Sequence, residues 1–145
     1  MAFIKELFHA LLVVQPPHPI FVHFPIALIS AAFFFLLLAY WRKSALFDKI
    51  AFANIALACV SIIVAGTFGI IDNAARFKGT APNHIAKIII ASTLFVLTGV
   101  IVLLRSKNPD LFQGRFKGWY LLVHFVCFAL VLVQGFLGGI IVYGF

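Results

Sequence analysis

Four long apolar runs dominate this chain of 145 residues and leave few architectures open to it. The runs span roughly residues 19–41, 49–71, 84–104 and 119–143. Each is close to the ~20 apolar residues that a helix needs to cross a hydrocarbon core about 30 Å thick. None shows the alternating pattern of a barrel strand, and backbone groups in lipid must form hydrogen bonds within their own segment. The runs therefore predict four membrane-spanning helices.

The composition excludes a water-soluble fold. Hydrophobic residues make up 64% of the chain and charged residues 10%, whereas soluble domains are about 45–50% apolar and about 25% charged. The excess of basic residues lies in the loops between the apolar runs. We therefore expect the chain to meet the lipid bilayer and not nucleic acid.

The basic residues predict the orientation of the chain in the membrane. Alternating spans place the loops 42–49 and 105–118 on one side, with seven basic residues: Arg42, Lys43, Lys49, Arg105, Lys107, Arg115 and Lys117. The other side carries four: Lys5, Arg76, Lys78 and Lys87. Because cytoplasmic loops are enriched in Lys and Arg, we expect both termini to face outward. In a bacterial inner membrane this side is the periplasm.

An amphipathic segment precedes the first span. Residues 2–14 are too few to cross a membrane, and their apolar side chains recur with helical period opposite Lys5 and Glu6. This pattern is typical of a helix that lies in the membrane interface. We expect residues 1–17 to form this helix and a Pro-rich connector, and residues 18–145 to form an all-α, four-helix antiparallel transmembrane domain.

Local signals predict how the spans begin and bend. Pro19 suits the first position of the first span, and Pro25 removes a helical hydrogen bond, so a kink is expected there. Asp48 and Asn83 are the expected N-caps of the second and third spans. Small residues form two stripes of the kind that lets membrane helices pack closely: Ser61, Ala65 and Gly69, and Gly135, Gly138 and Gly139.

The histidines carry most of the functional signal. Alternating spans bring His18, His23 and His84 to the outer side of the bundle, together with Asp72. His124 lies some five residues inside the fourth span, which at about 1.5 Å per residue places it well over ~10 Å in depth from His23. We expect His124 to make a hydrogen bond within the bundle instead of joining the others.

Asp72 needs a compensating partner, because a carboxylate at the C-terminal end of a helix meets the negative end of the helix dipole. Arg76, one turn further on, is the simplest partner. The other candidate is a ring N–H of one of the three outer histidines, which a carboxylate often orients when the histidine binds a metal.

Three chemistries and one structural role stay open for this group. Haem b needs two imidazoles that face each other across a bundle, with small residues nearby. The two cysteines, Cys59 and Cys127, lack the spacing for covalent haem attachment. A copper or zinc site would gather the three histidines and the carboxylate, and a quinone site would pair a histidine with a carboxylate. In the structural role, the histidines are only polar residues at the membrane interface.

Four stretches resemble a family of bacterial membrane proteins, domain-of-unknown-function family 2231. They are HPIFVHFPIAL (18–28), FGIID (68–72), NHIAK (83–87) and GFLGGIIVY (135–143), and the resemblance covers residues 18–143. Its paired histidines, aspartate and third histidine correspond to His18, His23, Asp72 and His84. Some relatives are joined to Rieske-type or cytochrome domains, so the resemblance implies redox work.

We therefore expect a small membrane protein that holds haem b near the outer surface and passes electrons, exchanging them with quinol, a cytochrome or a larger redox complex. His23 and His84 would be the axial ligands. The supporting residues would be His18 and Asp72 beside the ligands, and Arg76, Lys78 and Lys87 at the propionates. No nucleophile–base pair, phosphate-binding loop or H-E-x-x-H motif occurs, so we do not expect an enzyme. The alternative is a cofactor-free structural subunit of a respiratory or photosynthetic membrane complex.

Overall fold

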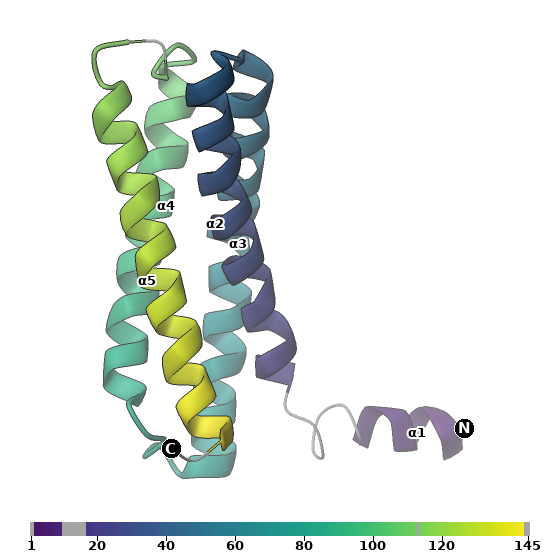
Figure 1. Cartoon of the computed structure of the whole chain (residues 1–145). Coiled ribbons are helices and arrows are strands. Elements are labelled where there is room, and N and C mark those ends of the chain that lie inside the picture. The colour runs from purple at the N-terminus through teal and green to yellow at the C-terminus, as the bar shows by residue number, and fades with distance from the viewer. Residues whose placement is uncertain (1, 10–16, 113, 144–145) are drawn as a thin grey trace.

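The computed structural model describes residues 2–9, 17–112 and 114–143 of the chain (Figure 1). The described residues form five helices, α1 (Ala2–His9), α2 (Pro17–Arg42), α3 (Ala45–Phe77), α4 (His84–Lys107) and α5 (Lys117–Tyr143), and no strand. Four of them, α2 to α5, are long and apolar enough to cross a membrane. The predicted all-α bundle of four membrane helices is confirmed.

The four long helices run alternately up and down in a closed ring (Figure 1). Each packs against two neighbours: α2 contacts α3 and α5, and α4 contacts the same two helices. The pairs α2 and α4, and α3 and α5, therefore lie diagonally across the bundle. Short connections force neighbours in sequence to be antiparallel neighbours in space.

Small side chains set the core between α2 and α3, the closest-packed pair. Ala32, Leu36 and Ala39 on α2 meet Ala51 and Ala58 on α3, and all are fully buried. These alanines are seven residues, or two turns, apart on each helix and let the two backbones approach closely. Helices associate in lipid in this way, without a hydrophobic driving force.

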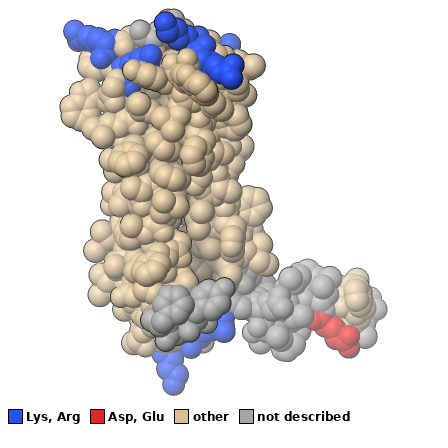
Figure 2. Space-filling model, in the orientation of Figure 1, with Lys and Arg blue, Asp and Glu red and all other residues tan. Residues whose placement is uncertain are grey.

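Large apolar side chains cover the outside of the bundle. Leu57, Val60 and Ile63 on α3, and Ile89 and Val96 on α4, are all more than half exposed. Figure 2 shows a broad uncharged band between two ends that carry the lysines and arginines, with more of them at the end formed by the α2–α3 and α4–α5 connections. This is the surface of a protein whose solvent is lipid.

The short N-terminal helix is also present. α1 lies apart from the bundle, at the end where α2 begins (Figure 1), and exposes Phe3 and Ile4 beside Lys5 and Glu6. The predicted helix extended to residue 14; residues 10–14 lie outside the described part of the chain.

The helix ends differ from the sequence-based prediction. α2 begins two residues before Pro19, and α3 extends to Phe77 instead of ending near residue 71. The expectation that Asp48 caps α3 is wrong: the N-cap is Ser44, and Asp48 lies in the first turn, buried and paired with Arg105. Asn83 does occupy the N-cap of α4, but its side chain makes no capping hydrogen bond.

Candidate functional site: a histidine-lined cavity

A cavity of about 750 Å³ opens between the four long helices at the end where α2 begins. We call it the histidine cavity. Its lining includes six of the seven residues that the sequence predicted as a site: His18, His23, Asp72, Arg76, His84 and Lys87. Alternating helix direction brings these residues to one end of the bundle, as expected. Cavities of this size are typical of ligand pockets.

Small residues keep the cavity open. Ala65, Gly66 and Gly69 line it on α3, Ala91 on α4, and Gly135, Gly138 and Gly139 on α5. A Cβ atom added at Gly138 would have no atom within 4 Å. The stripes that the sequence suggested as packing seams therefore also border open space.

His18 is held between α2 and α3. Its Nδ1–H donates to the carbonyl oxygen of Ala65 at 3.1 Å. The ring rests on Gly69, where an added Cβ would lie 2.8 Å from Cε1 of His18, too close for any side chain. Gly69 is thus needed so that the ring of His18 can reach α3.

His23 and His84 are each fixed by a carbonyl of their own chain segment. Nδ1 of His23 is bonded to the carbonyl of Pro19, one turn earlier in α2. Nδ1 of His84 donates to the carbonyl of Ala81 at 2.8 Å, just before α4 begins. His23 is exposed and His84 is partly buried.

These hydrogen bonds fix the chemistry of all three rings. A carbonyl oxygen only accepts, so in each neutral ring Nδ1 carries the proton and Nε2 keeps its lone pair. A histidine whose Nδ1–H is held by a backbone carbonyl is the usual form of a metal-ligating histidine. The cavity is therefore lined by three imidazoles whose Nε2 atoms have no hydrogen-bond partner among the described residues.

Of the two partners considered for Asp72, the structure shows Arg76 and not a histidine. Asp72 lies inside α3, and its nearest partner is Arg76, with Nη1 3.9 Å from Oδ1. Among the described residues, no histidine donates to Asp72, because the Nδ1 atoms bond to carbonyls. The expected orientation of an imidazole by this carboxylate is therefore not seen. Lys87 lines the cavity, partly buried.

Lys78 does not belong to the cavity. It is the C-cap of α3, in the left-handed conformation with φ 49°, and it is exposed. The helix extends past the membrane-facing part of the chain, which carries Lys78 beyond the cavity rim. Its expected role at a propionate stays a prediction, although Lys78 is not part of the cavity lining.

Gln134 is a cavity residue that sequence reasoning missed. It projects from α5 into the lining, and its buried Oε1 has no hydrogen-bond partner among the described residues. It is the one amide in the apolar run 119–143. Because an unpaired polar group is costly in lipid, this isolated amide was the signal that could have identified it.

The alternative of a copper or zinc site is not assembled. Within the described parts of the chain, no three His, Cys, Asp or Glu side chains lie close enough together to hold a metal ion. The two thiols, of Cys59 and Cys127, are free.

A second polar group lies at the opposite end of the bundle. Asp48 at the start of α3 pairs with Arg105 near the end of α4, and Arg105 also donates to the carbonyl of Pro109. The prediction for His124 is confirmed: it is buried, and its Nδ1–H donates to the Tyr120 carbonyl at 2.9 Å. The antiparallel topology already placed Asp48 and Arg105 on one side of the membrane, which was the signal for this pair.

Comparison with known proteins gives one result. The family model described as "Predicted membrane protein (DUF2231)" matches residues 14–145. No curated protein and no solved structure matches the chain significantly.

Proposed function

We propose a function for this chain, which belongs to the DUF2231 family of predicted membrane proteins, as a haem b protein that passes electrons near the outer surface of a bacterial inner membrane. The family description gives the membrane and no activity. The proposal rests on one observation: three histidines of one cavity each have Nδ1 bonded to a carbonyl and Nε2 free.

The position of the histidines on the helices favours two ligands on opposite walls. His23 belongs to α2 and His84 to α4, which lie diagonally across the bundle. Haem b between these helices would be held by the imidazoles of His23 and His84 from facing helices. His18 is fixed against α3 by Ala65 and Gly69, so we assign it to positioning α2.

The charged residues of the cavity are placed to contact the propionates of a bound haem b. Haem b carries two propionates, and two cations line the cavity, Arg76 and Lys87. Arg76 is only loosely tied to Asp72, at 3.9 Å and half exposed, so it can turn to a new carboxylate at little cost. Gln134 also lines the cavity, and its buried Oε1 has no hydrogen-bond partner among the described residues.

Bound haem would supply one-electron chemistry to this site. The chain's own part is to fix the imidazoles, place cations at the rim and exclude bulk water with the apolar residues of α2 to α5. We propose no catalytic residues of the chain itself. Exchange partners in keeping with this position are quinol in the lipid or a larger redox complex at the outer surface.

Asparagine substitutions give the sharpest test of the ligands. In His84→Asn and His23→Asn, the side-chain amide can still donate to the Ala81 or Pro19 carbonyl, but Nε2 is gone. We expect each variant to fold and to lose the six-coordinate haem spectrum that the unaltered protein shows after purification with added haem. His124→Asn is the matched control, because it keeps the bond to Tyr120 and lies outside the cavity.

The outcome separates haem binding from the alternative of a cofactor-free subunit. If the histidines serve only the fold, the asparagine variants and the unaltered protein give the same spectrum. Folded protein without any haem band would contradict the proposal. Co-purification of a larger complex, unaffected by both asparagine substitutions, would favour the alternative.

A further inference from the structure

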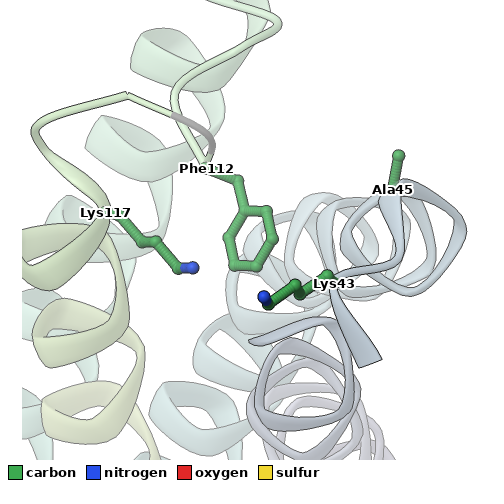
Figure 3. Close-up of a pocket in the computed structure, with 4 residues that line it drawn as sticks. All are labelled: Lys43, Ala45, Phe112 and Lys117. Atoms are coloured by element: carbon green, nitrogen blue, oxygen red, sulfur yellow. The ribbon is translucent and has the colours of Figure 1, made fainter. Parts of the chain in front are cut away.

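A second cavity lies at the other end of the bundle and shares no residue with the first. Its volume is about 320 Å³, and its lining is Lys43, Ala45, Phe112 and Lys117 (Figure 3). Two connections and the start of one helix meet there: the α2–α3 turn supplies Lys43, the α4–α5 loop supplies Phe112, and α5 begins with Lys117. We call it the lysine pocket.

Both lysines direct their ammonium groups into this pocket. Figure 3 shows the two side chains extending from opposite sides toward the space beside the ring of Phe112. Nζ of Lys117 lies 4.1 Å from the ring centroid of Tyr40 and 5.0 Å from that of Phe112. Aromatic faces attract an ammonium group, so these two rings hold the charge of Lys117 at the pocket wall.

Neither lysine has an acidic partner among the residues that the structure describes. The ion pairs among the described residues are Asp72 with Arg76 and Asp48 with Arg105. Asp48, in the first turn of α3, is buried and already paired with Arg105. Two like charges that converge without a counter-charge repel each other, so an anion between them would be stabilised.

The pocket lies at the depth of lipid headgroups. α2 ends at Arg42 and α5 begins at Lys117, so the apolar spans stop at this level. Trp41 and Trp119, the two tryptophans of the chain, lie here with 74% and 67% of their surface exposed. Exposed tryptophan marks the interface between hydrocarbon and water.

We propose that the lysine pocket binds the phosphate of an anionic phospholipid. The two ammonium groups contact the phosphate, and the rings of Phe112 and Tyr40 contact the apolar part next to it. Basic pockets between membrane helices are known to receive such headgroups. A zwitterionic lipid binds more weakly, because the positive charge of its headgroup is repelled by the two lysines. Free phosphate shares the chemistry but lacks the apolar contact.

Native mass spectrometry of the full chain in detergent tests this. Phosphatidylglycerol, phosphatidylethanolamine and inorganic phosphate are titrated separately. We expect phosphatidylglycerol to bind best, and the double variant Lys43→Gln/Lys117→Gln to bind it roughly 30-fold more weakly, since each interfacial lysine contributes on the order of 1 kcal/mol. Lys49→Gln/Arg115→Gln is the control: it removes two charges from the same end but none from the pocket lining.

Each result decides the proposal. Weakening confined to the pocket variant supports it. Equal weakening in both variants shows a general surface charge effect and overturns it, as does no weakening in either. Binding of inorganic phosphate as strong as that of the lipid overturns the assignment to a lipid. Circular dichroism of both variants confirms that they keep the helices.

Discussion

At the scale of single residues, several polar side chains of the membrane helices are held by backbone hydrogen bonds. His18, His23 and His84 each bond a carbonyl through Nδ1. Polar groups in the membrane are costly unless paired. All three of these rings line one cavity. The buried Nε2 of His124, outside that cavity, also has no hydrogen-bond partner among the described residues.

Gly69 provides the first prediction at this scale. Gly69→Ala places a methyl group 2.8 Å from the His18 ring, which must leave the Ala65 carbonyl. We expect the unfolding free energy to fall by about 1–3 kcal/mol, the usual cost of overpacking. Denaturant titration in mixed micelles measures it. Gly66→Ala, one turn earlier with no atom within 4 Å of an added Cβ, should be neutral or stabilising; equal losses in both would refute the contact.

The buried ion pair of Asp48 and Arg105 provides the second prediction at this scale. Asp48→Asn leaves the Arg105 charge buried without a counter-charge, and breaking such pairs costs about 3–5 kcal/mol. We expect a large loss of thermal stability in detergent. Asp110→Asn removes an exposed carboxylate at the same end and should change little. A stability for Asp48→Asn that equals the control would show that the pair is not formed.

At the scale of elements, α5 combines a packed half with an open half. Tyr120, His124, Cys127 and Val131 recur every three or four residues and are buried. Towards the C-terminal end, glycines replace them, and the cavity begins. The inward face of α5 thus packs in the core in its first half. In its second half it lines the histidine cavity, because its side chains are smaller there.

A larger side chain on the α5 wall of the histidine cavity tests whether haem binds there, and it leaves every histidine in place. In Gly138→Leu the new side chain enters open space, so we expect the protein to fold and its haem content to fall sharply. Gly99→Leu on α4 also enters open space but outside the cavity, and should leave haem content unchanged. Haem absorbance per protein, measured after size-exclusion chromatography, gives both values. Unchanged haem content in Gly138→Leu would show that haem does not bind in this cavity.

The helices also show what hydropathy can and cannot predict. Hydropathy located all four membrane-spanning helices in the sequence, because a helix needs about 20 apolar residues to cross the lipid. It placed the end of α3 near residue 71, whereas the helix continues to Phe77 and stops before Gly79, whose φ is 83°. Hydropathy marks where lipid ends, and a helix ends where a residue such as this glycine turns the backbone.

At the scale of the whole molecule, alternating helix direction was enough to predict which residues share an end. It brought His18, His23, His84 and Asp72 to one cavity. It did not predict hydrogen-bond partners or that Gln134 faces inward, because these depend on the rotation of each helix about its axis. Sequence spacing fixes depth in the membrane much better than rotation.

Orientation in the membrane is the prediction at this scale. The end with the α2–α3 and α4–α5 connections carries more of the basic residues (Figure 2), so it should be cytoplasmic. Alkaline phosphatase fused after Phe145 should be active in the periplasm, and the same reporter inserted at Gly114 should be inactive. The reverse pattern would place the histidine cavity on the cytoplasmic side.

The haem content of the purified, unaltered chain decides whether the histidine cavity holds a cofactor. The protein is produced with added haem, shown to be folded by circular dichroism, and assayed as its pyridine haemochrome. We expect about one non-covalently bound haem b per chain, held by two histidines. Folded chains with no haem, or with haem that washes off at the rate of free haem in micelles, would contradict it.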